Sequence, residues 1–126
     1  MTSKDFRYHN ENPYKIEEND CVCRAISRAL GLEYEIVANL LELSASYFEC
    51  DTLCVCCYNY LLEKIFRLPV RFCDDWETVG EIANMYPNNK LLIRIDGHLT
   101  MSDCGVIYDL WDCTHKLVDC YWIIPN

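Results

Sequence analysis

The sequence predicts a single α+β domain in which N-terminal helices pack on a C-terminal antiparallel β-sheet. Apolar residues recur at helical spacing in the first half of the chain, whereas the segments after residue 90 are short, rich in β-branched and aromatic residues and separated by turn residues. Segregation of helices from strands is typical of the α+β class. The chain has 126 residues, of which 52% are hydrophobic and 25% charged. Because this length and composition suit one core, we assign residues 1–126 to one domain.

The N-terminal half is expected to hold three helices behind a polar arm. Residues 1–18 are polar and are expected to be irregular. The first helix is predicted to begin after Asp20, a good N-cap residue, and to end before Gly31, which readily adopts the left-handed conformation found after a helix. Its apolar stripe carries no polar residue, which indicates a well-buried helix. The spacing of apolar residues predicts two further helices, at 33–48 and at about 52–66.

The C-terminal half is expected to form the sheet. A helix is predicted at 76–86 because Pro87 would end it. The turn sequence Asp103-Cys104-Gly105, in which the glycine supplies a positive φ, folds one strand back along the strand before it. The strands therefore form an antiparallel meander. They are predicted at 70–73, 91–96, 98–102, 106–109 and 116–124.

The charge of the chain argues against two classes of partner. The formal net charge is −9, and the 11 lysines and arginines are scattered without a cluster. Nucleic-acid binding and adhesion to anionic membranes both need concentrated positive charge. No stretch approaches the roughly 18 apolar residues of a membrane span. We therefore expect no nucleic-acid partner and no membrane partner.

The chain contains ten cysteines, which is high for its length. The first thirteen residues contain no apolar run that would form the core of a signal peptide. We therefore expect an intracellular, cytoplasmic protein whose thiols stay reduced, rather than a disulfide scaffold. Most of the cysteines are then interpreted as small buried hydrophobic residues.

One cysteine, Cys21, has a position that suits a reactive thiol. It falls in the first turn of the first predicted helix, where free N–H groups and the helix dipole lower the pKa of a thiol. The same N–H groups can stabilise an oxyanion. Cys23 competes for this role but points roughly 200° away around the helix. We favour Cys21 because the amides of the first turn are freest there.

A histidine and an aspartate are expected to meet on the sheet. His98 follows Gly97 at the start of a predicted strand. Pairing about the 103–105 turn brings residues 108–110 opposite His98, so Asp109 is expected near the imidazole, where it would fix the tautomer. Asp112 is the alternative if the strand bulges.

The segments DCVCRA at 20–25, GHLT at 97–100 and IYDLWD at 107–112 resemble the papain-like cysteine peptidase superfamily. They are most similar to its small bacterial and phage-encoded branches, related to the C39-like and NlpC/P60-like groups. The order Cys, His, Asp matches, and the aspartate followed two residues later by tryptophan is similar to the Asn-x-Trp element of papain-type enzymes. The resemblance covers roughly residues 14–124 and implies a papain-like core.

The resemblance implies a thiol hydrolase that cleaves a peptide, isopeptide or related amide bond without a cofactor or a metal. Cys21 would be the nucleophile, His98 the general base and Asp109 the residue that orients His98. The partner would be a protein or peptide substrate, including a host protein in the host cytoplasm if the chain is phage-encoded. Relatives often carry a Gln oxyanion donor where this chain has Lys15, and Asn12 or Asn19 are the candidate replacements.

Two other classes of function stay open. A catalytically inactive papain-like fold would act as a viral effector or inhibitor by protein–protein binding. A Cys-rich zinc-binding protein would use the dense segment 50–57, with Cys113 and His115 as further ligands. Helical spacing favours Cys54 and Cys57 as core residues instead.

Overall fold

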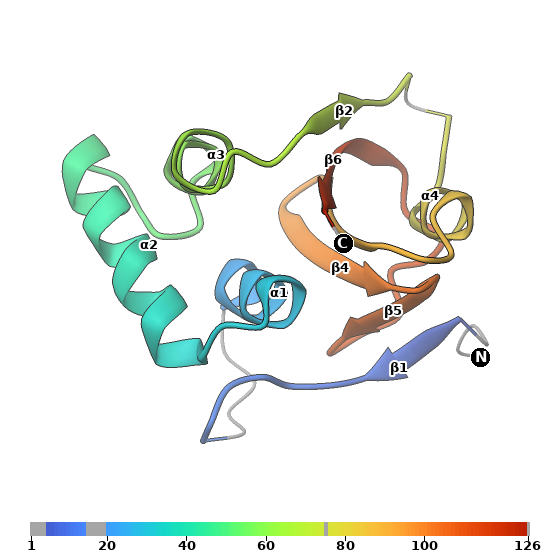
Figure 1. Ribbon diagram of the computed structural model, residues 1–126, viewed down its shortest axis with the longest axis horizontal. Coiled ribbons are helices and arrows are strands. Elements are labelled where there is room, and N and C mark those ends of the chain that lie inside the picture. Colours follow the sequence, from blue (N-terminus) through green and yellow to red (C-terminus); the bar gives the residue numbers. More distant parts are fainter. Residues whose placement is uncertain (1–4, 15–19, 75, 126) are drawn as a thin grey trace.

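The described residues contain four α-helices and a six-stranded mixed sheet in a computed structural model that covers residues 5–14, 20–74 and 76–125 (Figure 1). The fold class is therefore α+β, as predicted. The helices are α1 (Cys21–Leu30), α2 (Tyr34–Phe48), α3 (Val55–Tyr60) and α4 (Val79–Met85), and α3 continues into a π-helical segment, η1 (Leu61–Ile65). The strands are β1 (Phe6–Tyr8), β2 (Val70–Phe72), β3 (Lys90–Ile95), β4 (His98–Asp103), β5 (Val106–Asp109) and β6 (Val118–Ile124).

The sheet has the order β1-β5-β4-β3-β6-β2, and β1 is parallel to β5 while the other neighbours are antiparallel. The expectations of an irregular arm and a purely antiparallel sheet are therefore wrong at this edge. Backbone bonds hold β1: the Ile107 N–H donates to the Asp5 carbonyl at 2.7 Å, and the His9 N–H donates to the Asp109 carbonyl at 3.0 Å. Within β1 only Phe6 is buried. The residue pattern did not predict this strand, because β1 is held mainly by backbone hydrogen bonds to the open edge of β5 and not by an alternating apolar face.

Helices cover both faces of the sheet (Figure 1). α1 lies against β4 on one face, with α2 packed against α1. α4 lies on the other face. The alternating side chains of β3 mark the two layers, because Leu92 belongs to the core around α1 whereas Leu91 and Ile93 belong to the core around α4.

α1 is the central helix of the larger core. Ile26 is completely buried, and such burial contributes about 1.5–3 kcal/mol to stability. The helix ends as predicted, because Gly31 has a φ of 66° and its N–H donates to the Ser27 carbonyl. Asp20 precedes the helix but makes no side-chain cap bond. Its carboxylate faces other partners, which are described below.

Two helices begin later than the apolar spacing predicts. Before α3, the carboxylate of Asp51 accepts a bond from the Leu53 N–H at 2.8 Å and forms a turn, so Cys54 becomes the N-cap residue. Before α4, a capping box joins Thr78 and Glu81, with the Glu81 N–H donating to Thr78 Oγ1 at 3.2 Å. In both cases hydrogen bonds between a side chain and the backbone delay the start of the helix beyond the position that the apolar spacing predicts.

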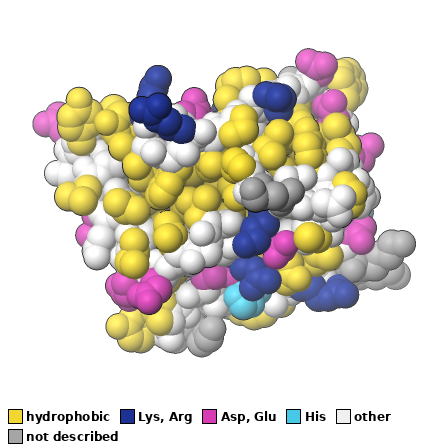
Figure 2. Space-filling model, in the orientation of Figure 1, with side chains coloured by type: hydrophobic (Ala, Val, Ile, Leu, Met, Phe, Trp, Pro, Cys, Tyr) yellow, Lys and Arg dark blue, Asp and Glu magenta, His cyan; other side chains and the backbone are white. Residues whose placement is uncertain are grey.

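The face shown in Figure 2 carries a broad area of hydrophobic side chains, with acidic side chains mostly toward its margins. None of the helices in the described ranges has the length and apolar character needed to cross a bilayer.

Candidate active site

Cys21 is the first residue of α1. The first backbone bond of the helix runs from the Arg24 N–H to the Asp20 carbonyl at 3.0 Å, so the Cys21 thiol sits at the end where the N–H groups of a helix lack intrahelical acceptors. The residue is 8% exposed. Its sulfur therefore meets both the positive end of the helix dipole and a pocket described below.

His98 and Asp109 form a short hydrogen bond, with Nε2 of the imidazole 2.6 Å from Oδ2 of the carboxylate. His98 is the first residue of β4 and Asp109 the last residue of β5. The indole of Trp111 packs on the imidazole, with ring centroids 4.9 Å apart. A carboxylate and an aromatic ring thus hold the imidazole in place.

The β4–β5 turn explains how these two side chains meet. Cys104 and Gly105 both have positive φ, at 51° and 84°. This is the conformation of the two-residue hairpin turn whose twist matches that of the paired strands. The strands pair through Ser102 opposite Ile107 and Asp103 opposite Val106. Continuing this register sets residue 111, rather than residues 108–110, opposite residue 98. The expected pairing was therefore off by at least one position, and Asp109 reaches the imidazole as a diagonal neighbour.

The thiol of Cys21 and the side chain of His98 interact, and each shifts the pKa of the other. Burial raises the pKa of Cys21, but the bonds with His98 and the Leu99 backbone outweigh it, so the net pKa is lowered. Burial lowers the pKa of His98, but the bonds with Asp109, Cys113 and Cys21 raise it to about 11. Both shifts favour a thiolate beside an imidazolium at neutral pH.

Cys23 lies in a different environment. Its sulfur donates to the Tyr34 carbonyl at 3.5 Å, and burial raises the pKa of its thiol to about 12. The structure therefore brings Cys21, and not Cys23, against His98. The separation around the helix that the sequence indicated accounts for this difference.

Asp112 does not take the place of Asp109. Its Oδ1 accepts bonds from the Thr114 N–H at 3.1 Å and from Thr114 Oγ1 at 2.6 Å. Of the two aspartates considered from the sequence, Asp109 alone is bonded to His98. Burial raises the pKa of Asp109, but its bond with His98 and the charge of His98 lower it on balance, so the carboxylate stays ionised.

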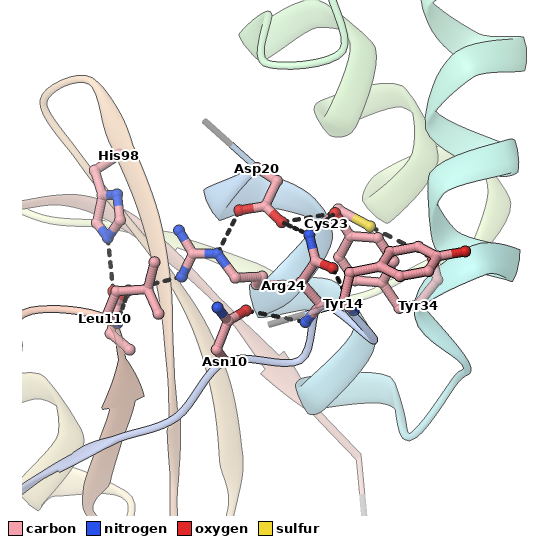
Figure 3. Close-up of polar contacts among 10 residues, drawn as sticks. Asn10, Tyr14, Asp20, Cys23, Arg24, Tyr34, His98 and Leu110 are labelled. Atoms are coloured by element: carbon pink, nitrogen blue, oxygen red, sulfur yellow. Dashed lines mark hydrogen bonds and ion pairs between the residues drawn. The ribbon is translucent and has the colours of Figure 1, made fainter. Parts of the chain in front are cut away.

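Arg24 is the residue of this site that the sequence analysis missed. Its side chain extends from Asp20 toward His98 and Leu110 (Figure 3). Nε lies 2.6 Å from Asp20 Oδ1, and Nη1 lies 3.1 Å from Asp109 Oδ1. The guanidinium is buried, with 5% of the residue exposed. The signal was present as an aspartate and an arginine four residues apart at the start of a helix whose buried side is mostly apolar.

The hydrogen bonds that begin at Asp109 and Arg24 continue beyond Asp20 to Tyr34 and Asn12. The hydroxyl of Tyr34 donates to Asp20 Oδ2 at 2.6 Å, and Asn12 Nδ2 donates to the same oxygen at 3.3 Å. Because the Asn12 amide is held in this network, it is not the oxyanion donor that the sequence suggested. The other two positions considered, Lys15 and Asn19, lie outside the described residues.

A pocket of about 490 Å³ opens beside Cys21 and His98. Tyr58 lines it and is only 3% exposed, and burial raises the pKa of its phenol to about 12, so this hydroxyl stays protonated at neutral pH. The lining of the pocket carries both a positive side chain, Arg94, and two negative ones, Asp96 and Asp119. The remaining lining residues are Val22, Leu53, Val55, Ile95, Gly97 and Leu99.

No protein family, curated protein or solved structure matches this chain.

Two groups among the described residues have the donor atoms for a metal ion. Cys113, whose sulfur lies 3.8 Å from Asp109 Oδ2, groups with His98 and Asp109. In this group the imidazole and carboxylate bond directly to each other, and Arg24 holds the second carboxylate oxygen, which argues against an ion between them. The second group is Cys50, Cys54 and Cys56. Cys113, a possible further ligand of the 50–57 segment in the zinc alternative, is not part of this group, because it packs in the core around α4.

Proposed function

We propose that this protein is a thiol hydrolase of the papain-like type that cleaves a peptide, isopeptide or related amide bond. The observation that carries the proposal is the continuous chain of contacts from the Cys21 thiol through the His98 imidazole to the Asp109 carboxylate at the edge of a pocket. The helix-start cysteine, the histidine on the sheet and the order of the three residues support the papain-like assignment.

The reaction begins with attack of the Cys21 thiolate on the carbonyl carbon of the scissile amide. His98 then gives its proton to the leaving amine, and an acyl-thioester remains on Cys21. His98, now neutral, takes a proton from water as the water oxygen attacks the thioester. The carboxylic acid leaves, and the thiolate and imidazolium are regenerated. Asp109 keeps the imidazole oriented through Nε2, which leaves Nδ1 for the proton transfers.

The tetrahedral intermediate carries a negative oxygen that needs donors. The backbone N–H groups of the first turn of α1 suit this role because Cys21 begins the helix. The phenol of Tyr58 is a second donor from the wall of the pocket. This arrangement replaces the Gln side chain of related enzymes with a tyrosine that comes from a different helix, α3.

The substrate in this proposal is a protein or peptide that enters the pocket in extended form. Arg94, which pairs with Asp119 at 3.8 Å, and Asp96 line the pocket and would bind polar groups of opposite sign. The reaction would take place in the cytoplasm, where the thiol of Cys21 stays reduced.

The nucleophile is tested by alkylation with iodoacetamide at about pH 6, where ordinary thiols are protonated. We expect peptide mapping to find Cys21 modified well before Cys104, which is exposed but whose thiol has a raised pKa. A peptidyl vinyl sulfone should likewise form one adduct at Cys21, and Cys21→Ala should lose both this adduct and peptide hydrolysis. Cys104→Ser is the matched control and should retain both. Cys21 reacting no faster than Cys104 would refute the assignment, and a Cys21→Ala variant with full biological effect would favour the inactive effector.

A further inference from the structure

Three thiols converge at the surface turn between α2 and α3. Sγ of Cys56 lies 3.4 Å from Sγ of Cys50 and 3.1 Å from Sγ of Cys54. All three sulfurs lie within 4.8 Å of one another. This cluster, Cys50, Cys54 and Cys56, is separate from the contacts of Cys21 with His98.

Hydrophobic packing explains this cluster only in part, because Cys50 and Cys54 pack against the edge of the core around α1. Cys56 is exposed, and Cys50 and Cys54 are partly exposed. The interpretation of Cys54 as a core residue holds only in part, since Cys54 packs against the core but is the half-buried N-cap of α3. Cys57 shows the contrast, because it is completely buried and its thiol donates to the Leu41 carbonyl at 3.3 Å.

Backbone bonds hold the turn in a defined shape. The Cys50 N–H donates to the Ala45 carbonyl at 2.9 Å, which closes the end of α2. The Cys54 N–H donates to the Asp51 carbonyl at 3.0 Å, and the Asp51 carboxylate accepts from the Leu53 N–H. The three cysteines are thus presented by a turn that is already organised, which lowers the ordering cost of binding a ligand.

We propose that Cys50, Cys54 and Cys56 bind one Zn²⁺ ion through three thiolates. Zinc–sulfur bonds are about 2.3 Å long, so sulfurs of one tetrahedral site lie roughly 3.8 Å apart, close to the spacing of this cluster. A water molecule would complete the coordination on the exposed side of the cluster, where Cys56 lies. Binding replaces the three thiol protons with the ion, and the protons leave to solvent.

The arrangement favours an ion over a disulfide. A disulfide joins two sulfurs and leaves the third out, whereas Cys56 contacts both of the others at once. A single metal ion engages all three. Leu53 and Val55, which alternate with Cys54 and Cys56 along the chain, line the pocket beside Cys21. The ion would therefore stiffen one wall of that pocket.

The proposal is tested on the whole protein, metal-stripped and with all ten thiols shown to be reduced. Titration with Co²⁺ should produce sulfur-to-metal charge-transfer absorption that saturates at one equivalent, and Zn²⁺ should displace the Co²⁺. Cys56→Ser should weaken Zn²⁺ binding by more than about 100-fold, beyond the effect of changes outside the ligand set. Cys104→Ser, a second exposed cysteine, and Cys21→Ala should each bind as the parent does.

Three results with the parent and the single variants would overturn the proposal. They are the absence of charge-transfer absorption, equal zinc affinity in Cys56→Ser and the parent, and loss of binding in Cys21→Ala. The last result would move the metal to the site of His98. A triple Cys50→Ser, Cys54→Ser, Cys56→Ser variant, checked for folding by circular dichroism, should bind no zinc, and retained stoichiometric binding there would contradict the assignment equally.

Discussion

Arg24→Met is expected to lower the free energy of unfolding by about 3–5 kcal/mol. The guanidinium bonds two buried carboxylates at once, Asp20 at 2.6 Å and Asp109 at 3.1 Å. Methionine fills much of the same volume but leaves both carboxylates without this cation inside the protein. Breaking a buried pair by removing one partner is costly because the other charge stays desolvated. Denaturant unfolding followed by circular dichroism measures the loss.

Arg28→Met is the matched control for this prediction. Arg28 lies one turn further along α1, and its guanidinium stacks on the Tyr108 ring at 4.1 Å rather than bonding a buried carboxylate. Its removal should cost about 0.5–2 kcal/mol. If Arg24→Met proves as mild as Arg28→Met, the buried carboxylates do not depend on Arg24. Asp20→Asn should reduce the penalty of Arg24→Met, because one of the two stranded charges is then absent.

His98→Gln is expected to raise the pKa of Cys21 and to lower peptide hydrolysis by about 10²–10⁴-fold. The direction follows from the contacts, since burial raises the pKa of this thiol and the His98 bond is the largest influence that lowers it. In the parent protein the thiolate forms as pH rises through the lowered pKa of Cys21. The imidazolium persists until pH reaches about 11. The ion pair therefore exists between the lowered pKa of Cys21 and about pH 11.

The rate of Cys21 alkylation across pH, read by peptide mapping, checks this prediction. The parent should reach its plateau at a lower pH than an ordinary thiol, and His98→Gln should move the midpoint upward toward the usual value of about 8.5 or beyond. His115→Gln is the control, because His115 is exposed and should leave the midpoint unchanged. An unchanged midpoint in His98→Gln would show that the helix start alone activates the thiol.

The sequence was informative where short-range patterns decide structure. The apolar period predicted α2 within one residue at its start, and Gly31 marked the end of α1. Local patterns failed where side chains bond the backbone, as at Asp51 and Thr78, or where another strand supplies the partners, as for β1. The register of β4 and β5 was also misjudged. The register is set by a turn in which both Cys104 and Gly105 have positive φ. A sequence indicates positive φ at a glycine but not at a cysteine.

The sequence by itself determined the α+β class, the helix-start position of Cys21 and the strand positions of His98 and Asp109, because these depend on periodicity and on cap and turn residues close along the chain. Only the tertiary structure decided which groups touch. Arg24 meets Asp109 across 85 positions of sequence, and Asn12 is turned toward Asp20 rather than the pocket. Cys54 lies half-buried in a cluster of three thiols. Contacts of this kind are selected by packing and by the cost of burying unpaired charge, and neither has a local signature in the order of residues.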